Sequence, residues 1–199
     1  MEIAILLFEG FDELDAIGPF EVFENAANAG AECTTTLRAL EGTSSVTASH
    51  GLEVGVDGVL DEANPDLLLV PGGGWNDRER PGAYREAERE AIPEAVAAQY
   101  ERGGSVAGVC TGGMLLARAG VLDGRPAVTH ASALDDLRAT GAEVVDARVV
   151  DDGDVLTAGG VTSGLDLAVH VVDREFGSEI AAAVRTEMEY EPQGGVHTT

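Results

Sequence analysis

The residue in this sequence most suited to covalent chemistry is Cys110. It lies in the pattern Gly108-x-Cys110-x-Gly112, between the apolar run 105–109 and a helical run. Small residues two positions away on each side allow a sharp strand-to-helix turn to close around a nucleophile. A thiol at the start of a helix also meets free N–H groups and the positive end of the helix dipole, which favour the thiolate. The pattern therefore predicts a cysteine nucleophile on an elbow.

The alternative for Cys110 is an inert thiol, which is the usual state of a cysteine in apolar surroundings. The two flanking glycines and the preceding strand favour the nucleophile. The other cysteine, Cys33, has neither feature, and we expect it to be structural and both cysteines to be reduced. A second turn, Gly72-Gly73-Gly74, follows the apolar run 66–70, and its N–H groups could complete an oxyanion hole. Its alternative is a plain flexible loop.

Short apolar runs alternate with helical segments along the chain. The runs 3–8, 66–70 and 105–109 are apolar throughout, as in strands buried on both faces, and 163–176 and 179–188 are helical in character. This order predicts the α/β class: a doubly wound three-layer sandwich with a mostly parallel, flavodoxin-like sheet and a nucleophile elbow. The ligand site should lie at the carboxyl ends of the central strands, where both glycine-rich turns fall.

The length fits one domain, which we place at residues 1–190, with 191–199 as a frayed tail. We expect a first helix with Pro19 in its first turn and a helical region over 81–102 that is interrupted at Pro93.

The charge balance is strongly acidic. The chain has 36 acidic and 12 basic residues, all of the latter Arg, for a net charge of -24. The acids are spread along the chain, which favours adaptation to high salt in a halophilic organism over an acidic site for a basic partner. This charge disfavours nucleic acid as a partner, and we expect none. No basic leader and no apolar run of membrane-spanning length is visible, so we expect a cytoplasmic protein without membrane contact.

Several motifs together resemble the DJ-1/PfpI superfamily, also called ThiJ or class I glutamine-amidotransferase-like. The resemblance covers residues 3 to about 189 and rests on five segments: Leu14 to Phe23 (LDAIGPFEVF), Val70 to Gly73 (VPGG), Gly108 to Gly112 (GVCTG), Val128 to His130 (VTH) and Thr157 to Gly164 (TAGGVTSG). The first segment and the Cys-Thr-Gly sequence are most similar to isonitrile hydratases.

The resemblance implies roles for individual residues. Cys110 would be the nucleophile, and Asp15 the acid that approaches its sulfur and stays protonated, since a carboxyl group beside a negative sulfur has a raised pKa. Thr111 and Gly73, with the neighbouring Gly72, would supply N–H groups, and His130 would move a proton. The alternatives are a helix cap for Asp15 and an exposed loop position for His130. No His, Cys and carboxylate cluster has metal-ligand spacing, and we expect no metal or cofactor.

The resemblance leaves three functions open. The first is a cofactor-independent lyase that hydrates a small electrophilic carbon, as isonitrile hydratases do, and the second is glyoxalase or deglycase chemistry on 2-oxoaldehydes. The third is a non-catalytic cysteine sensor of redox stress. Peptidase activity is disfavoured because Thr111 stands where peptidase-like members carry His. A second departure concerns the hydratases: Ala131 stands where they often carry an aromatic residue, which changes the pocket for the substrate and weighs against an isonitrile. The expected partners are a small-molecule substrate and, as in relatives, a second copy in a homodimer or higher oligomer.

Overall fold

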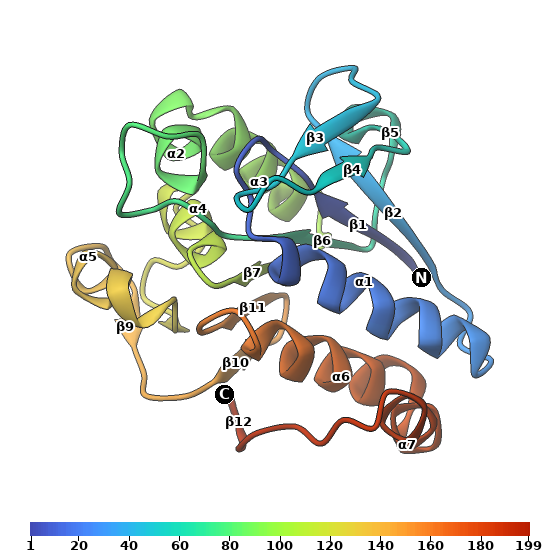
Figure 1. Cartoon of the computed structure of the whole chain (residues 1–199). Helices are drawn as coiled ribbons and strands as arrows, with labels where there is room; N and C mark the ends of the chain where they lie inside the picture. The colour runs from blue at the N-terminus through green and yellow to red at the C-terminus, as the bar shows by residue number, and fades with distance from the viewer.

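An eight-stranded sheet crosses the centre of the molecule (Figure 1). This computed structural model describes the backbone of residues 1–199 and every side chain except that of Glu62. The sheet consists of β1 (Glu2–Leu6), β2 (Thr34–Ala39), β5 (Gly58–Val59), β6 (Leu67–Val70), β7 (Ser105–Val109), β10 (Val149–Asp152), β11 (Val155–Ala158) and β12 (Val196–Thr198). Their spatial order is β12-β10-β11-β7-β6-β1-β2-β5, and every neighbouring pair is parallel except β10 with β11.

Helices cover both faces of this sheet (Figure 1). One layer consists of α1 (Glu13–Asn28), α6 (Ser163–Phe176) and α7 (Ser178–Glu187), and the other of α2 (Ala83–Arg89), α3 (Ala91–Glu101) and α4 (Gly112–Arg118). The shorter elements are η1 (Leu60–Glu62), η2 (Ala131–Ala133), α5 (Leu134–Arg138), the antiparallel pair β3 (Ser45–Thr47) and β4 (Glu53–Gly55), and the parallel pair β8 (Pro126–Ala127) and β9 (Glu143–Val144). The predicted α/β class and mostly parallel sheet are confirmed.

The central strands are apolar along their whole length because helices pack against both faces of the sheet. All four residues of β6 are fully buried, and β1 and β7 are buried apart from their first residues. Burial on both faces removes the alternation that a half-exposed strand would show. The carboxyl ends of β6, β7 and β11 lie side by side, so the turns that follow them meet at one edge of the sheet.

Three local expectations differ from the structure. The first helix begins at Glu13 after the cap residue Asp12, so Pro19 lies inside α1, where it cannot donate to the Asp15 carbonyl. The break between α2 and α3 falls at Glu90, which has a left-handed φ of 64°; Pro93 lies in the first turn of α3, where its N–H is not needed. The tail expected to fray instead ends in β12, which pairs with β10.

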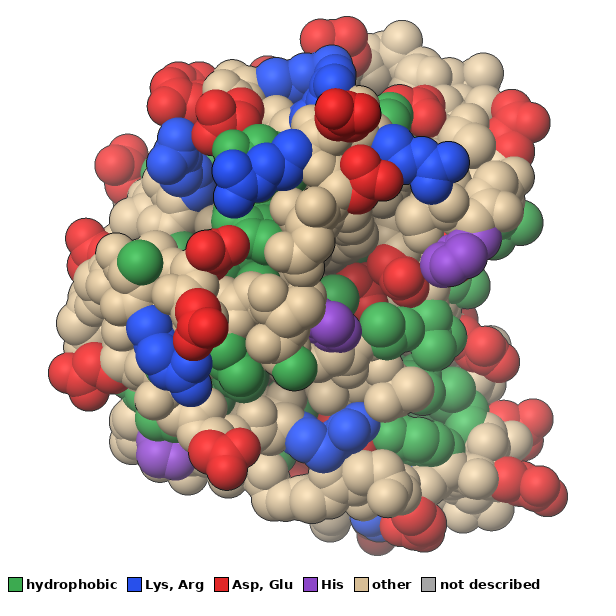
Figure 2. All heavy atoms as spheres, turned by 60° about the vertical axis from the view of Figure 1, so that its left-hand side comes forward, with side chains coloured by type: hydrophobic (Ala, Val, Ile, Leu, Met, Phe, Trp, Pro, Cys, Tyr) green, Lys and Arg blue, Asp and Glu red, His purple; other side chains and the backbone are tan. Residues whose placement is uncertain are grey.

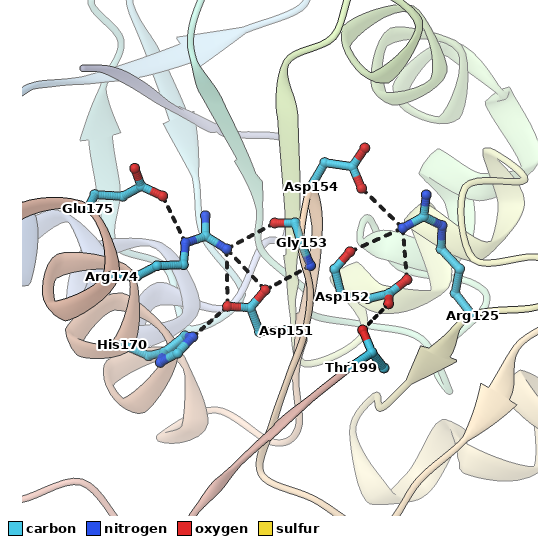
Figure 3. Close-up of polar contacts among 9 residues, drawn as sticks. All are labelled: Arg125, Asp151, Asp152, Gly153, Asp154, His170, Arg174, Glu175 and Thr199. Carbon is cyan, nitrogen blue, oxygen red and sulfur yellow. Dashed lines mark hydrogen bonds and ion pairs between the residues drawn. The ribbon is translucent and has the colours of Figure 1, made fainter.

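Polar contacts fix the β10–β11 hairpin to α6 (Figure 3). The buried carboxylate of Asp151 accepts hydrogen bonds from His170 Nε2 at 2.6 Å, from an Arg174 terminal nitrogen at 3.0 Å and from the Gly153 N–H at 2.9 Å. The backbone N–H of Thr199 donates to the Asp151 carbonyl, which ties the chain end to the same hairpin. The hairpin is thereby held in place, and with it the segment after β11 that reaches the candidate site.

On the face that Figure 2 shows, acidic side chains are spread out rather than gathered in one patch. Of the helices in the described part of the chain, none has both the length and the apolar character needed to cross a bilayer.

Candidate active site

Cys110 lies at the tip of the turn between β7 and α4. Its φ is 57°, a left-handed value that costs a non-glycine residue about 1–3 kcal/mol. Its N–H donates to the carbonyls of Ala158 at 3.1 Å and Gly159 at 2.9 Å, and its carbonyl accepts from Thr129 Oγ1 at 2.8 Å. Contacts with two other segments therefore hold the strained residue, and the elbow geometry expected at Cys110 is present.

The glycines of the elbow allow the backbone of neighbouring turns to come very close. A Cβ atom on Gly112 would lie 2.1 Å from the Val70 carbonyl oxygen, and one on Gly72 would lie 2.4 Å from the Thr111 nitrogen. Any side chain at either position would force the turn after β6 away from the elbow. The two glycine-rich turns are thus packed against each other.

Asp15 is the carboxyl group beside the thiol. It lies in the first turn of α1, which starts where the Asp12 side chain accepts the Leu14 N–H at 3.2 Å. Asp15 is fully buried; its Oδ2 accepts the Gly72 N–H at 3.0 Å, and the carboxyl group interacts with the Cys110 thiol. Among the described side chains, its Oδ1 has no N–H or O–H partner. Asp15 is therefore not the helix cap, a role that Asp12 fills.

Burial raises the pKa of both members of the pair. Burial and the nearby charge of Asp12 raise the pKa of Asp15 to about 8, against the smaller opposing effects of the Gly72 N–H and the thiol. Burial and the charge of Asp15 raise the pKa of Cys110 to about 12, although the N–H groups of Thr111 and Val161 act in the opposite direction. Two adjacent buried groups titrate as a unit, so the pair carries at most one negative charge near neutral pH.

The helix start was expected to favour a free thiolate by lowering the pKa of Cys110, but this pKa is raised. Cys110 is only 6% exposed, and the helix that follows it has seven residues. The N–H groups of Thr111 and Val161 do favour negative sulfur, but burial and the carboxyl group outweigh them. The resting site therefore retains a proton on Asp15 that it can deliver, and the thiol proton can replace it on Asp15 as the sulfur reacts.

The two predicted glycine donors do not face the sulfur. The Gly72 N–H binds Asp15, and the Gly73 N–H donates to Thr111 Oγ1 at 2.9 Å. The backbone N–H groups that lower the pKa of Cys110 are those of Thr111 and of Val161, which the sequence motifs did not single out. The pair Gly159-Gly160 at the end of β11 was the available signal for Val161, because a glycine turn after a central strand brings backbone N–H groups to the same sheet edge.

His130 lies at this edge, at the start of η2. Its ring packs against Gly160, where an added Cβ would lie 2.9 Å from Cδ2 and 3.4 Å from Nε2. Its Nδ1 is 2.8 Å from Ser132 Oγ and accepts the Ser132 N–H at 3.2 Å. Within the described part of the chain, no hydrogen bond joins His130 to Cys110 or Asp15. The structure thus brings together Cys110, Asp15 and Thr111, and places His130 beside the Gly160–Val161 segment.

One group of possible metal ligands, which the sequence spacing did not reveal, forms where the β3–β4 turn meets α1. Ligand atoms of Asp12, Glu13 and His50 lie within 4.8 Å of one another. In this arrangement Glu13 Oε2 and His50 Nδ1 are 2.6 Å apart and bind each other. Burial raises the pKa of Glu13, but hydrogen bonds from His50, Ser49 and the backbone together outweigh it and lower this pKa to about 2. The Glu13 carboxylate in turn raises the pKa of His50. The pair is an ion pair that tethers the start of α1.

The fold and the site define a class: α/β proteins with a cysteine on a strand-to-helix elbow and a protonated carboxyl partner. The model of the DJ-1/PfpI family matches residues 1–174, and the chain belongs to this family. It is 31% identical over 193 residues to an isonitrile hydratase of Pseudomonas putida, covering 96% of this chain and 79% of that protein.

Two further comparisons support the family and the fold. The chain is 33% identical over 157 residues to the deglycase TK1284 of Thermococcus kodakarensis, covering 77% of this chain and 86% of the relative. A crystal structure of a THiJ/PfpI family protein from Pseudomonas syringae superposes with a TM-score of 0.85 at 28% identity, covering 97% of this chain and 76% of that one. The resemblance drawn from the motifs is thereby confirmed at the level of the family.

Proposed function

We propose that this protein is a cofactor-independent lyase that hydrates a small electrophilic carbon, of which an isonitrile is the best-fitting example. The observation on which this rests is the recessed Cys110 thiol beside a buried Asp15 carboxyl group that keeps its proton at neutral pH. The terminal carbon of an isonitrile is narrow and unsubstituted, so it can reach a sulfur that is 6% exposed. The alignment with an isonitrile hydratase over 96% of the chain supports the same chemistry.

The proposed cycle keeps atoms and protons in balance. The sulfur of Cys110 bonds to the isonitrile carbon while a proton of the pair, delivered by Asp15, moves to that carbon, giving a covalent thioimidate. Water then adds to the carbon; Asp15 takes one proton from the water and passes one to the nitrogen. The carbon–sulfur bond breaks, the hydroxyl proton returns to the pair, and an N-substituted formamide leaves. The N–H groups of Thr111 and Val161 stabilise negative charge on the sulfur as it attacks and departs.

The second candidate is conversion of a 2-oxoaldehyde by the same thiol. The observation that favours it is the similarity to the Thermococcus kodakarensis deglycase, at 33% identity over 157 residues. Redox sensing fits the site less well, because a sensor thiol needs exposure and a lowered pKa, whereas burial raises the pKa of Cys110 to about 12. A peptide would also not reach a thiol that is recessed to this degree.

Turnover of cyclohexyl isocyanide and of methylglyoxal tests the proposal directly. Wild type should form N-cyclohexylformamide, and Cys110→Ala and Asp15→Asn should reduce the rate at least about a hundredfold. Cys33→Ala is the matched control, because Cys33 is a free, half-buried thiol whose Sγ donates a hydrogen bond to the Phe23 carbonyl. Consumption of methylglyoxal alone would favour the second candidate, and no consumption of either compound would exclude both.

The same proposal places the protein in the salt-rich cytoplasm of a halophilic organism, as a homodimer. A net charge of -24 repels itself at low ionic strength and is screened by salt. The unfolding midpoint should therefore rise by about 5 °C or more between dilute and molar KCl, which corresponds to about 2 kcal/mol at this chain length. Light scattering in molar KCl should give twice the chain mass of 20.5 kDa. A midpoint that falls with salt, or a monomeric mass, would contradict the respective part.

A further inference from the structure

We propose that Asn76 and Ser132 are positioning residues that hold His130 in its Nε2–H tautomer. The Nε2–H group is then a hydrogen-bond donor beside Gly160 and Val161. This inference rests on the proposed function and extends it to residues outside the Cys110–Asp15 pair. Asn76 lies in the segment after β6, Ser132 in η2, and His130 just before η2. Three hydrogen bonds connect them.

The directions of these hydrogen bonds determine where the His130 proton lies. The Ser132 backbone N–H can only donate, and it reaches His130 Nδ1 at 3.2 Å, so Nδ1 must offer a lone pair. Asn76 Nδ2 donates to Ser132 Oγ at 2.8 Å, which leaves the hydroxyl proton of Ser132 free to point at Nδ1, 2.8 Å away. With two donors at Nδ1, the neutral imidazole carries its proton on Nε2.

The ring edge that carries the Nε2 proton faces Gly160, the residue before Val161. His130 Nε2 and Cδ2 are the atoms nearest to a Cβ built on Gly160, so the ring packs against that residue where it has no side chain. The next residue, Val161, supplies an N–H to the Cys110 sulfur. The Nε2–H is therefore placed beside the backbone that binds the sulfur, where it can donate to the nitrogen of a thioimidate and make its carbon more reactive to water.

A second hydrogen bond keeps Asn76 in place. Trp75 Nε1 donates to Asp136 Oδ2 at 2.7 Å, one turn beyond Ser132, so adjacent residues of one segment bind the η2–α5 region at two points. The Trp75 ring also packs edge-on against Tyr84, with centroids 5.5 Å apart. Asn76 is thus held by its neighbour and is not a freely moving surface amide.

In this arrangement His130 does not act as a proton shuttle. An Nε2–H donor cannot also accept a proton at Nε2, and its only acceptor atom, Nδ1, is turned toward Ser132. His130 therefore polarises the substrate, while the proton transfers remain with Asp15. Asn76 and Ser132 act only through His130.

Nitrogen NMR of the full-length protein labelled at its imidazole nitrogens tests the proposal, with the His130 signals assigned from their loss in His130→Gln. Wild type should show the pattern of the Nε2–H tautomer. In Asn76→Asp, the new carboxylate accepts a hydrogen bond from the Ser132 hydroxyl group. Ser132 Oγ then turns a lone pair toward His130, and the fraction of His130 protonated at Nδ1 should rise. Asn64→Asp introduces the same charge before β6, at the opposite edge of the sheet, and should leave the pattern unchanged.

The outcomes separate this proposal from the proposed function. A wild-type Nδ1–H pattern, or an Asn76→Asp spectrum identical to wild type, would overturn the assignment whether or not the protein turns over an isonitrile. If wild type does turn over cyclohexyl isocyanide, kcat should fall about tenfold in Asn76→Asp and stay unchanged in Asn64→Asp. Circular dichroism of each variant checks that the fold is retained.

Discussion

Replacing Asp15 by Asn tests the electrostatic basis of the site through stability as well as activity. Asparagine has nearly the same shape and can still accept the Gly72 N–H through its amide oxygen. Unlike aspartate, it does not ionise. The native pKa of Asp15 is about 8, mainly because of burial, against an ordinary value of 3.8. Between these two values the native protein holds a proton that the unfolded chain has released.

The size and sign of the effect follow from that difference. A raised native pKa gives stability that is fully present below pH 3.8 and is lost as pH rises toward 8. Each pH unit in this window costs the wild type about 1.4 kcal/mol, so at pH 7 the burial of this acid costs about 4 kcal/mol. Asp15→Asn should therefore be more stable than wild type at pH 7 by up to about 4 kcal/mol, and nearly equal to it at pH 4.

Urea unfolding of both proteins in molar KCl, at unit steps from about pH 4 to about pH 8, measures this difference directly. Asp173→Asn, which removes an exposed carboxylate from α6, is the control and should follow the wild-type curve. A difference between wild type and Asp15→Asn that stays constant across this range would refute the raised pKa and, with it, the claim that the site stores a proton. The same variant should be inactive in the isonitrile assay.

Three further outcomes follow from single contacts. Gly112→Ala places a Cβ 2.1 Å from the Val70 carbonyl and should cost at least about 2 kcal/mol of unfolding free energy, whereas Gly42→Ala, with open space around it, should cost less than about 0.5 kcal/mol in the same urea titration. Asp151→Asn should cost about 2 kcal/mol of unfolding free energy at neutral pH. Burial raises the pKa of the Asp151 carboxyl group, but hydrogen bonds led by that from His170 outweigh burial and lower the pKa. The stability that these bonds give is lost as pH falls through the lowered native pKa, so the difference in unfolding free energy between wild type and Asp151→Asn should close in acid. Asp12→Asn keeps a competent helix cap but removes a charge that raises the pKa of Asp15, so the pH midpoint of turnover should move down; a midpoint that does not move would contradict this coupling.

Sequence patterns were sufficient to predict the parts of the fold that depend on interactions between residues near one another in the chain. The unbroken apolar runs of β1, β6 and β7 identify strands buried on both faces, and the bounds of α6 match the predicted helix 163–176. The elbow at Cys110 could be predicted because a tight strand-to-helix turn requires small residues two positions away on each side of its tip, and glycines stand at both. Each of these features depends on residues that are close together in the chain.

Features that depend on distant contacts were missed. The tail was expected to fray, but β12 gains backbone pairing from the edge of β10, which the tail sequence itself cannot indicate. Pro19 suggested a helix start, yet α1 begins six residues earlier at a cap formed by Asp12. Val161 was not assigned because its importance lies in a backbone N–H, and a backbone group is supplied by position rather than by residue type.

The direction of the thiol pKa shows most clearly why a local motif does not determine a site. The elbow motif describes the N–H groups at the sulfur, which favour a thiolate, but says nothing about the burial of the sulfur or about α1, which brings Asp15 beside it. Adding sulfur and hydrogen to an isonitrile carbon needs a proton as well as a nucleophile, and a solvent-exposed aspartic acid would have lost its proton at neutral pH. Burying Asp15 keeps that proton available, at a cost of about 4 kcal/mol in stability that a purely structural residue would not impose. A stable but inactive Asp15→Asn is therefore the combination expected of an acid whose burial serves chemistry rather than folding.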